Sequence, residues 1–217
     1  MPEHPFDGLE VRQVGVPAQA AAPPTRSRQT PAFYFHLGSP ECYLAAERLS
    51  ELLPVVPEWI PVTGSFALGL KRAEIERLVV ERGLQALRWP ADWPPQTEVA
   101  MRAATYAKSI GRVTAFSLAA FRQAFAGGRD LDSPDTVVIA GAACEIHPAA
   151  LLKGIEMRSV ALALEDASVE AHSLGVRRLP ALAVGGRIFE GDAALVDAAE
   201  AIQASVGTAR AGQRASR

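Results

Sequence analysis

The chain has 217 residues, of which 49% are hydrophobic and 21% charged, so its composition is that of a folded globular protein rather than a disordered one. Its 22 basic and 24 acidic residues give a formal net charge of −2, which supplies no positive field for nucleic acid or an anionic membrane. No apolar run approaches the ~18 residues that span a bilayer, and the first residues lack the basic start and apolar segment of a secretory signal. Two cysteines, Cys42 and Cys144, are too few for a disulfide framework, and we expect a protein of the reducing cytoplasm.

The two ends of the chain have low-complexity composition. Residues 16–31 contain four prolines and no large apolar residue after Val16, so this stretch cannot bury enough surface to offset the entropy of ordering it. We therefore predict a flexible leader over residues 1–31 and a flexible tail over residues 207–217.

Between these ends the pattern begins with a strand, a helix and a second strand. Residues 32–37 form a short apolar and aromatic run, typical of a strand buried on both faces. Ser39 and Pro40 then supply a helix N-cap and a first helical residue, and residues 54–62 are predicted to form a second strand, whose prolines indicate an edge strand or bent ends. The helix between the strands has one apolar stripe, made of Cys42, Ala45, Ala46, Leu49, Leu52 and Leu53.

A block of helices is predicted next, and the chain then returns to strands. The block has helices around residues 75–79, 101–110 and 116–125, one that begins at Ser133-Pro134, and one after Pro148 that carries Val160, Leu164, Ala167, Ala171 and Leu174 and stops at Gly175. Strands over 179–184 and 187–189, joined by a Gly185-Gly186 turn, precede a last helix that opens at Gly191-Asp192.

The order β-α-β, helices, then α-β-β-α predicts an α/β protein with a thioredoxin-like fold and an inserted all-helical domain. The thioredoxin-like domain would comprise residues 32–62 and 175–206. The insertion, with its connecting helix, would comprise residues 63–174.

The start of the first helix is the strongest candidate for chemistry. At Ser39, free amide N–H groups and the positive end of the helix dipole converge, so a thiolate or another anion is stabilised there. In thiol-disulfide oxidoreductases of this layout, a C-x-x-C pair occupies the four positions that read Ser-Pro-Glu-Cys here. Ser39 has no adjacent base to ionise it, but its hydroxyl can donate a hydrogen bond to a thiolate from another molecule. The alternative is a simple helix cap, like the one expected at Ser133.

Two later segments are further candidates. Pro180 opens a strand after a glycine-stopped helix, which fits a cis-proline loop that turns the backbone of Leu179 outward to pair with a peptide-like ligand. A trans proline at the start of a strand also fits. Gly191 and Asp192 begin the last helix, whose free amides can bind a carboxylate or can simply be capped by Asp192.

These segments resemble the DsbA-like family. The run from Phe33 to Ala45, with Ser39-Pro40 inside it, is similar to the opening of its branch of 2-hydroxychromene-2-carboxylate isomerases and kappa-class glutathione transferases. Three later stretches agree in order: Arg88-Trp89-Pro90, the region 103–125, and the region 175–191. The resemblance covers about residues 32–205.

The resemblance implies glutathione as a cofactor and a role for each candidate. Ser39 would face the glutathione sulfur and hold it as thiolate. Leu179, ahead of a cis Pro180, would pair with the cysteinyl backbone, and Gly191 and Asp192 would meet the γ-glutamyl carboxylate.

Aromatic and histidine side chains extend this picture. By the same resemblance, Trp89 and Trp93 would wall an aromatic substrate pocket. His36, at the end of the first strand, is placed to act as a base or to orient a substrate carboxylate, with a packed and hydrogen-bonded histidine as the alternative. His147 and His172 have no ligand-like spacing, so no metal site is predicted.

Three functional hypotheses follow. The first is a glutathione-dependent isomerase or transferase that acts on a small aromatic or acidic substrate. The second is a thiol-disulfide oxidoreductase that uses Cys42 alone, which requires an exposed thiol with a depressed pKa. The third is a non-catalytic binding module. The expected partner is a small molecule rather than nucleic acid or membrane, and the oligomeric state stays open, with a homodimer as one option.

Overall fold

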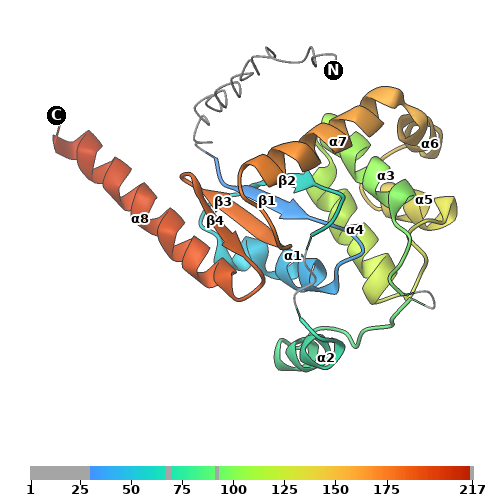
Figure 1. Cartoon of the computed structure of the whole chain (residues 1–217), viewed down its shortest axis with the longest axis horizontal. Helices are drawn as coiled ribbons and strands as arrows, with labels where there is room; N and C mark the ends of the chain where they lie inside the picture. Colours follow the sequence, from blue (N-terminus) through green and yellow to red (C-terminus); the bar gives the residue numbers. More distant parts are fainter. Residues whose placement is uncertain (1–29, 67–69, 91–92, 216–217) are drawn as a thin grey trace, which may run out of the picture.

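A computed structural model describes residues 30–66, 70–90 and 93–215, so the predicted leader lies almost entirely outside the described residues. Figure 1 shows a small sheet with a block of helices beside it and a long last helix on the opposite side. The elements in chain order are β1 (Ala32–Phe35), α1 (Pro40–Leu52), β2 (Glu58–Pro61), α2 (Arg72–Glu81), α3 (Glu98–Ser109), α4 (Val113–Phe125), α5 (Pro134–Ala142), α6 (Pro148–Glu156), α7 (Arg158–Ser173), β3 (Ala181–Val184), β4 (Arg187–Glu190) and α8 (Ala194–Ala215).

The four strands form one mixed sheet in the order β2-β1-β3-β4. β1 runs parallel to β2, where Phe33 pairs with Trp59, and antiparallel to β3, where Phe33 pairs with Leu182. β3 and β4 form the predicted hairpin, and both Gly185 and Gly186 have the positive φ that such a tight turn requires. The predicted α/β fold with a helical insertion is confirmed.

The centre of the sheet is buried on both faces, as its apolar sequence predicts. All four residues of β1 are fully buried. The rings of Phe33 and Phe35 lie 5.6 Å apart, and both pack edge-on against Trp59 of β2. Phe35 also contacts Phe121 of α4, with ring centroids 6.0 Å apart. The sheet and the helical block therefore share one core.

The second strand is shorter than predicted. It begins at Glu58, whose N–H donates to the carbonyl of Pro31 at 2.8 Å, and it ends at Pro61. The preceding stretch contains Pro54 and Pro57, which have no N–H to donate to a neighbouring strand. These prolines explain why the predicted strand loses its first four residues.

Helix α3 is the centre of the helical block. It packs against α4, α6 and α7, and it also contacts β2. Gly154 permits the close approach of α6, because a Cβ at this position would lie 2.4 Å from the ring of Tyr106 on α3. α7 contacts β2 as well, so α3 and α7 both pack against this edge strand of the sheet.

The last two helical predictions need correction. The sequence predicts one helix after Pro148, but the chain forms α6 and α7, because Met157 between them has extended backbone angles. The sequence also predicts a flexible tail from residue 207, but α8 continues to Ala215. Alanine, arginine and glutamine make up most of that stretch and favour a helix. Residues 216–217 lie outside the described residues.

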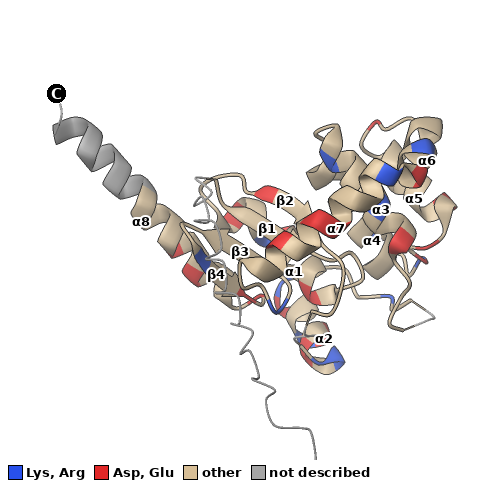
Figure 2. Ribbon diagram, turned by 45° about the horizontal axis from the view of Figure 1, so that its top comes forward, with Lys and Arg blue, Asp and Glu red and all other residues tan. Residues whose placement is uncertain are grey.

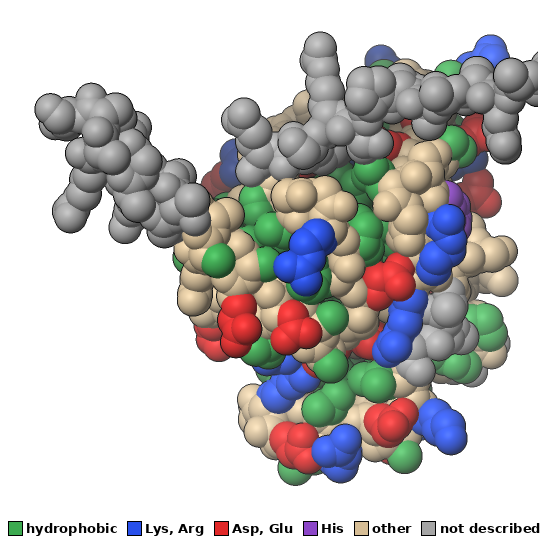
Figure 3. Space-filling view, turned by 60° about the vertical axis from the view of Figure 1, so that its left-hand side comes forward, with side chains coloured by type: hydrophobic (Ala, Val, Ile, Leu, Met, Phe, Trp, Pro, Cys, Tyr) green, Lys and Arg blue, Asp and Glu red, His purple; other side chains and the backbone are tan. Residues whose placement is uncertain are grey.

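Charges of both signs are spread over the molecule. In the ribbon of Figure 2, acidic and basic residues of the described chain are mixed along the helices rather than gathered by sign. On the face in Figure 3, acidic and basic side chains alternate, with small apolar areas between them. Such a distribution matches the near-neutral net charge of the sequence.

Candidate functional site

The first turn of α1 is built as the sequence predicts. Ser39 is the N-cap, with extended backbone angles, and its Oγ accepts a hydrogen bond from the N–H of Cys42 at 3.2 Å. The N–H of Ser39 donates to the carbonyl of His36 at 3.0 Å, and Pro40 is the first helical residue. Ser39 is partly exposed. Its hydroxyl therefore lies at the positive end of the helix, within reach of a ligand.

Cys42 lies below this hydroxyl and is fully buried. Burial raises the pKa of its thiol to about 12, although hydrogen bonds from the Ser39 side chain and the His36 backbone act in the opposite direction. The other cysteine, Cys144, is also buried, and burial raises its pKa. The hypothesis of redox chemistry through Cys42 alone required an exposed thiol with a depressed pKa, and the structure contradicts both requirements.

Iodoacetamide should therefore react with Cys42 very slowly in the folded protein. At pH 8 the thiolate fraction of a thiol with a pKa of about 12 is on the order of a thousandfold below that of a free cysteine. Mass spectrometry after timed alkylation, with and without urea, measures the two rates. A native rate close to the rate in urea would contradict the buried position of Cys42.

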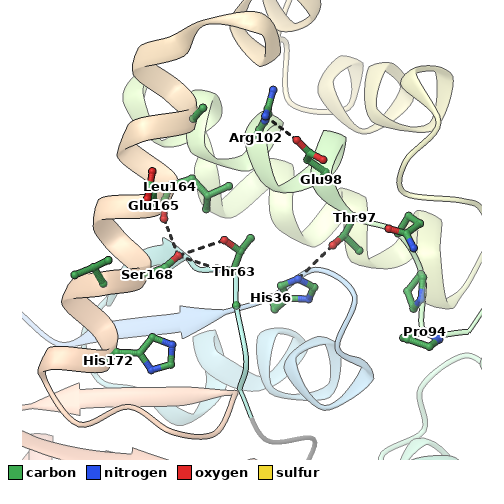
Figure 4. A pocket seen from close by; sticks show the side chains of 15 residues that line it. His36, Thr63, Pro94, Thr97, Glu98, Arg102, Leu164, Glu165, Ser168 and His172 are labelled. Atoms are coloured by element: carbon green, nitrogen blue, oxygen red, sulfur yellow. Dashed lines mark hydrogen bonds and ion pairs between the residues drawn. The ribbon is translucent and has the colours of Figure 1, made fainter.

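His36 and Thr97 form a hydrogen-bonded pair between β1 and α3. Nδ1 of His36 accepts from the N–H of Gly38 at 3.1 Å, and Nε2 lies 3.2 Å from Oγ1 of Thr97 (Figure 4). Burial lowers the pKa of His36 to about 4. Gly38 is needed for this packing, because a Cβ there would lie 2.9 Å from Cγ2 of Thr97 and 3.1 Å from the histidine ring. The packed and hydrogen-bonded alternative for His36 is the one that the structure shows.

The end of β2 is held to α7 by a second polar pair. Oγ of Ser168 accepts from the N–H of Thr63 at 2.9 Å and donates to the carbonyl of Leu164 at 2.7 Å. One turn later, the ring of His172 stacks on Phe66, with centroids 4.4 Å apart. These contacts fix α7 beside the carboxyl ends of the parallel strands.

A cleft of about 830 Å³ opens between these two pairs. Its walls come from His36 after β1, Thr63 and Gly64 after β2, residues 94–98 before and within α3, and the face of α7 that includes Ser168 and His172 (Figure 4). Ligands of open α/β sheets bind in such a crevice, beyond the carboxyl ends of the strands. The volume is within the range of about 300–1,000 Å³ that small-molecule sites occupy.

The predicted aromatic wall is displaced from this cleft. The indole N–H of Trp89 donates to Glu76 at 2.9 Å, and Arg72 lies over the ring of Trp89. Trp93 packs edge-on against Trp89 and does not line the cleft. The residues that do line it follow directly, from Pro94 to Thr97. Glu76 and Arg72 hold the Trp89 ring on the side of α2, so the place of the two tryptophans in a substrate pocket stays a prediction.

The loop before β3 lies against the start of α8. The Leu179–Pro180 peptide bond is cis, and the side chain of Leu179 is buried. The carbonyl of Pro180 accepts from the N–H of Gly191 at 2.7 Å. Like Ser39, neither Leu179 nor Pro180 lines the cleft. The pairing of the Leu179 backbone with a ligand stays a prediction.

An internal carboxylate joins this loop to the first turn of α1. Glu41 is 3% exposed, and its Oε1 accepts from Arg178 at 2.8 Å and from the N–H of Asp192 at 3.0 Å. Its Oε2 accepts from the N–H of Leu70 at 3.2 Å. The sequence shows Glu41 only as an acidic residue in a first helical turn, where a glutamate normally faces water. Its partners lie 29 to 151 positions away along the chain, so sequence spacing gave no signal for them.

Asp192 is buried in the same network. Its carboxylate is 5% exposed and accepts two hydrogen bonds from Arg82 and one from Arg48 at 3.3 Å. Because the N–H of Asp192 donates to Glu41, this amide is already paired with a carboxylate of the same chain. Gly191 is equally enclosed, since a Cβ there would lie 3.1 Å from Arg178. The two residues stabilise the fold here, and their contact with a γ-glutamyl carboxylate stays a prediction.

Neither a metal cluster nor a membrane-spanning helix is found in the part of the chain that the structure describes. Among the residues that the structure describes, no three His, Cys, Asp or Glu side chains are grouped closely enough to hold a metal ion. In the same part of the chain, no helix combines the length and apolar character needed to cross a bilayer.

Solved structures with the same fold include an isomerase and disulfide oxidoreductases. 2-Hydroxychromene-2-carboxylate isomerase is 14% identical, with a TM-score of 0.68 over 87% of this chain and 99% of that chain. DsbA from Pseudomonas aeruginosa is 15% identical, with a TM-score of 0.56 over 88% of this chain and 92% of that chain. The cytosolic disulfide reductase DsbM from Pseudomonas aeruginosa, solved with GSH, is 14% identical, with a TM-score of 0.61 over 83% of this chain and 99% of that chain. At these identities the likeness shows the fold alone.

The sequence itself carries a family assignment. No curated protein matches it. The family model described as DSBA-like thioredoxin domain matches residues 32–203, which include every strand, the first turn of α1, the cleft and the Glu41 network. The chain therefore belongs to the DSBA-like thioredoxin domain family.

Proposed function

We propose that this protein is a non-redox enzyme of the isomerase or transferase type, which uses glutathione as a thiol cofactor and acts on a small aromatic or acidic substrate. In this proposal the glutathione sulfur lies at the Ser39 hydroxyl, and the substrate occupies the cleft between the sheet and the helical block. We expect the enzyme to work in the cytoplasm, where glutathione is kept reduced.

The observation that carries the proposal is the chemistry at the first turn of α1. A partly exposed serine hydroxyl stands at the helix N-terminus, while the one cysteine of the motif is buried with a pKa raised to about 12. A thiolate that reacts here must therefore come from another molecule. The hydrogen bond from the Ser39 side chain already acts to lower the pKa of the Cys42 thiol, and the same hydroxyl can stabilise the thiolate of a ligand.

The cleft supports the second half of the proposal. The side chain of His36 lines the cleft. The carbonyl of the same residue accepts a hydrogen bond from the N–H of Ser39 at 3.0 Å, so the cleft begins three residues before the proposed thiol site. Leu164 and Pro94 give the cleft apolar walls, and Thr97 and Arg102 add polar groups. A mixed lining of this kind suits a small molecule that has both a ring and an oxygen function.

Calorimetric titration with reduced glutathione tests the proposal directly. We expect binding to the wild-type protein and a loss of affinity of about tenfold or more in Ser39→Ala, because a hydrogen bond to a charged sulfur is removed. Loss of the helix cap should lower the free energy of unfolding by only about 1 kcal/mol, so we expect the variant to fold. Circular dichroism checks this.

Ser133→Ala is the matched control. Ser133 also precedes a proline at a helix start, on α5, but its side chain makes no capping hydrogen bond. Its replacement should leave glutathione binding unchanged. The absence of heat with the wild-type protein, or equal affinities of wild type and Ser39→Ala, would exclude the proposed thiol site.

One observation favours a second candidate, a binding module without a thiol cofactor. The amide of Asp192 is paired with Glu41, so glutathione must bind without this amide or displace an internal carboxylate. A folded protein that gives no heat with glutathione, but is stabilised against heat by aromatic carboxylates, would support this second candidate over the first.

A further inference from the structure

The hydrogen bonds of His36 determine which way the hydroxyl of Thr97 can donate. Nδ1 of His36 accepts from the N–H of Gly38, and a backbone N–H can only donate, so Nδ1 carries no proton. In the neutral imidazole the proton is then on Nε2, which lies 3.2 Å from Oγ1 of Thr97. His36 is therefore the donor and the Thr97 oxygen the acceptor.

The hydroxyl proton of Thr97 is left without an acceptor in the described part of the chain. Thr97 is 8% exposed, and its hydrogen bonds there are the one from His36 and one that its carbonyl accepts from Met101. It is the residue before the first turn of α3, yet its side chain does not cap that helix. Its side chain lines the cleft (Figure 4). A buried hydroxyl donor without an acceptor is costly unless a ligand or water supplies one.

We propose that Thr97 is a ligand-binding residue, whose hydroxyl donates to a carbonyl or carboxylate oxygen of a small molecule in the cleft. His36 is the positioning residue that fixes the direction of this donor. The proposal deepens the proposed function, on which it rests, by naming the group of the substrate that is recognised and the side chain that recognises it.

The surroundings of Thr97 fit such an oxygen. Arg102 lies on the same helix, lines the cleft and is 35% exposed. It pairs with Glu98 through Nη2 at 2.6 Å, which leaves other guanidinium N–H groups for a ligand. Pro94 and Leu164 supply apolar surface for the rest of the molecule. The cleft thus combines donors with apolar walls, and among the described residues its acidic side chains are Glu98, which is paired, and Glu165.

Benzoate and benzamide are suitable probes, because each presents an oxygen acceptor on one aromatic ring. Calorimetric titration should show binding of at least one of them to the wild-type protein. Thr97→Val, which keeps the shape but removes the hydroxyl, should weaken that binding about tenfold or more. Thr97→Ser, which restores a hydroxyl, should bind within a few-fold of wild type.

Thr105→Val is the matched control on the same helix. The hydroxyl of Thr105 is buried and already donates to the carbonyl of Met101 at 2.9 Å, and it does not line the cleft. This variant should bind the probes like wild type. Equal affinities of wild type and Thr97→Val, or no binding of either probe to wild type at tens of millimolar, would overturn the proposal.

Nitrogen-15 NMR of the His36 ring provides a readout that needs no ligand. The Nε2–H tautomer is expected, and an Nδ1–H tautomer would overturn the assignment of the donor. These results are separable from the glutathione titration. Thr97-dependent probe binding without glutathione binding would refute only the thiol site, and glutathione binding without Thr97-dependent probe binding would refute only the role of Thr97.

Discussion

Replacement of Asp192 by alanine is expected to lower the free energy of unfolding by about 3 kcal/mol, one of the two largest effects that the structure predicts. The carboxylate is 5% exposed and is shared by Arg82 and Arg48, whose side chains are only 17% and 25% exposed. Without Asp192, two largely buried guanidinium groups lose the negative charge that stabilises them. Water that enters the site replaces only part of this stabilisation. Urea unfolding followed by circular dichroism measures the difference.

Glu81→Ala is the control for this measurement. It breaks the ion pair between Arg77 and Glu81 on α2, whose side chains are 62% and 50% exposed. An exposed pair one helical turn apart contributes only about 0.5 kcal/mol, so this variant should be close to wild type in stability. If Asp192→Ala were as stable as Glu81→Ala, the buried network would not be what holds the start of α8 against α1.

Stability is also expected to fall by about 3 kcal/mol between pH 7 and pH 4 because of His36 alone. Burial lowers its pKa in the folded protein to about 4, from an ordinary value of 6.5. Between these two values the unfolded chain binds a proton at His36 that the folded chain does not bind. The contribution is therefore fully present above pH 6.5, and it is lost as the pH falls toward and through 4.

Urea unfolding of wild type and His36→Asn at a series of pH values isolates this contribution. An asparagine oxygen can still accept from the N–H of Gly38, but the variant has no imidazole to protonate there. Its stability should therefore fall less steeply from pH 6.5 to 4 than that of wild type. His147→Asn controls for the loss of a histidine elsewhere, since the exposed ring of His147 caps α6 and asparagine is a good cap. The assignment to His36 would be wrong if His36→Asn and His147→Asn reduced the pH dependence of the free energy of unfolding equally, or if neither reduced it.

The two predictions concern the two ends of one structural unit. Glu41 and Asp192 fix the first turn of α1 against the start of α8, and His36 with Thr97 fixes the end of β1 against α3. Ser39 lies between these anchors, three residues after His36 and two before Glu41. Anchors on both sides hold the Ser39 hydroxyl in place, which would preorganise it for the ligand of the proposed function.

The local elements could be predicted from the sequence because their causes are local. The apolar run of β1 requires burial on both faces, and Ser39-Pro40 specifies a helix start wherever the chain folds. The glycine pair at 185–186 selects its own turn. The apolar stripe of α1 includes Cys42, and its full burial in the structure follows from that stripe.

The contacts between side chains that are far apart in the sequence could not be predicted in this way. Nothing near Glu41 in the sequence indicates that its carboxylate would accept from the amide of Asp192, 151 positions later. Nothing near Trp89 in the sequence indicates that Glu76 and Arg72 would hold its ring on the side of α2.

The sequence by itself determined the order of strands and helices, the thioredoxin-like fold with its helical insertion, and a serine in place of a cysteine at the first helix. Only the tertiary structure decided how completely Cys42 is buried, that the amide of Asp192 is paired with Glu41, and that Thr97 lines the cleft beside His36. The physical reason is the range of the interactions. Capping, turn geometry and apolar periodicity act within a few residues, whereas burial, charge pairing and the direction of a hydrogen bond depend on groups that only folding brings together.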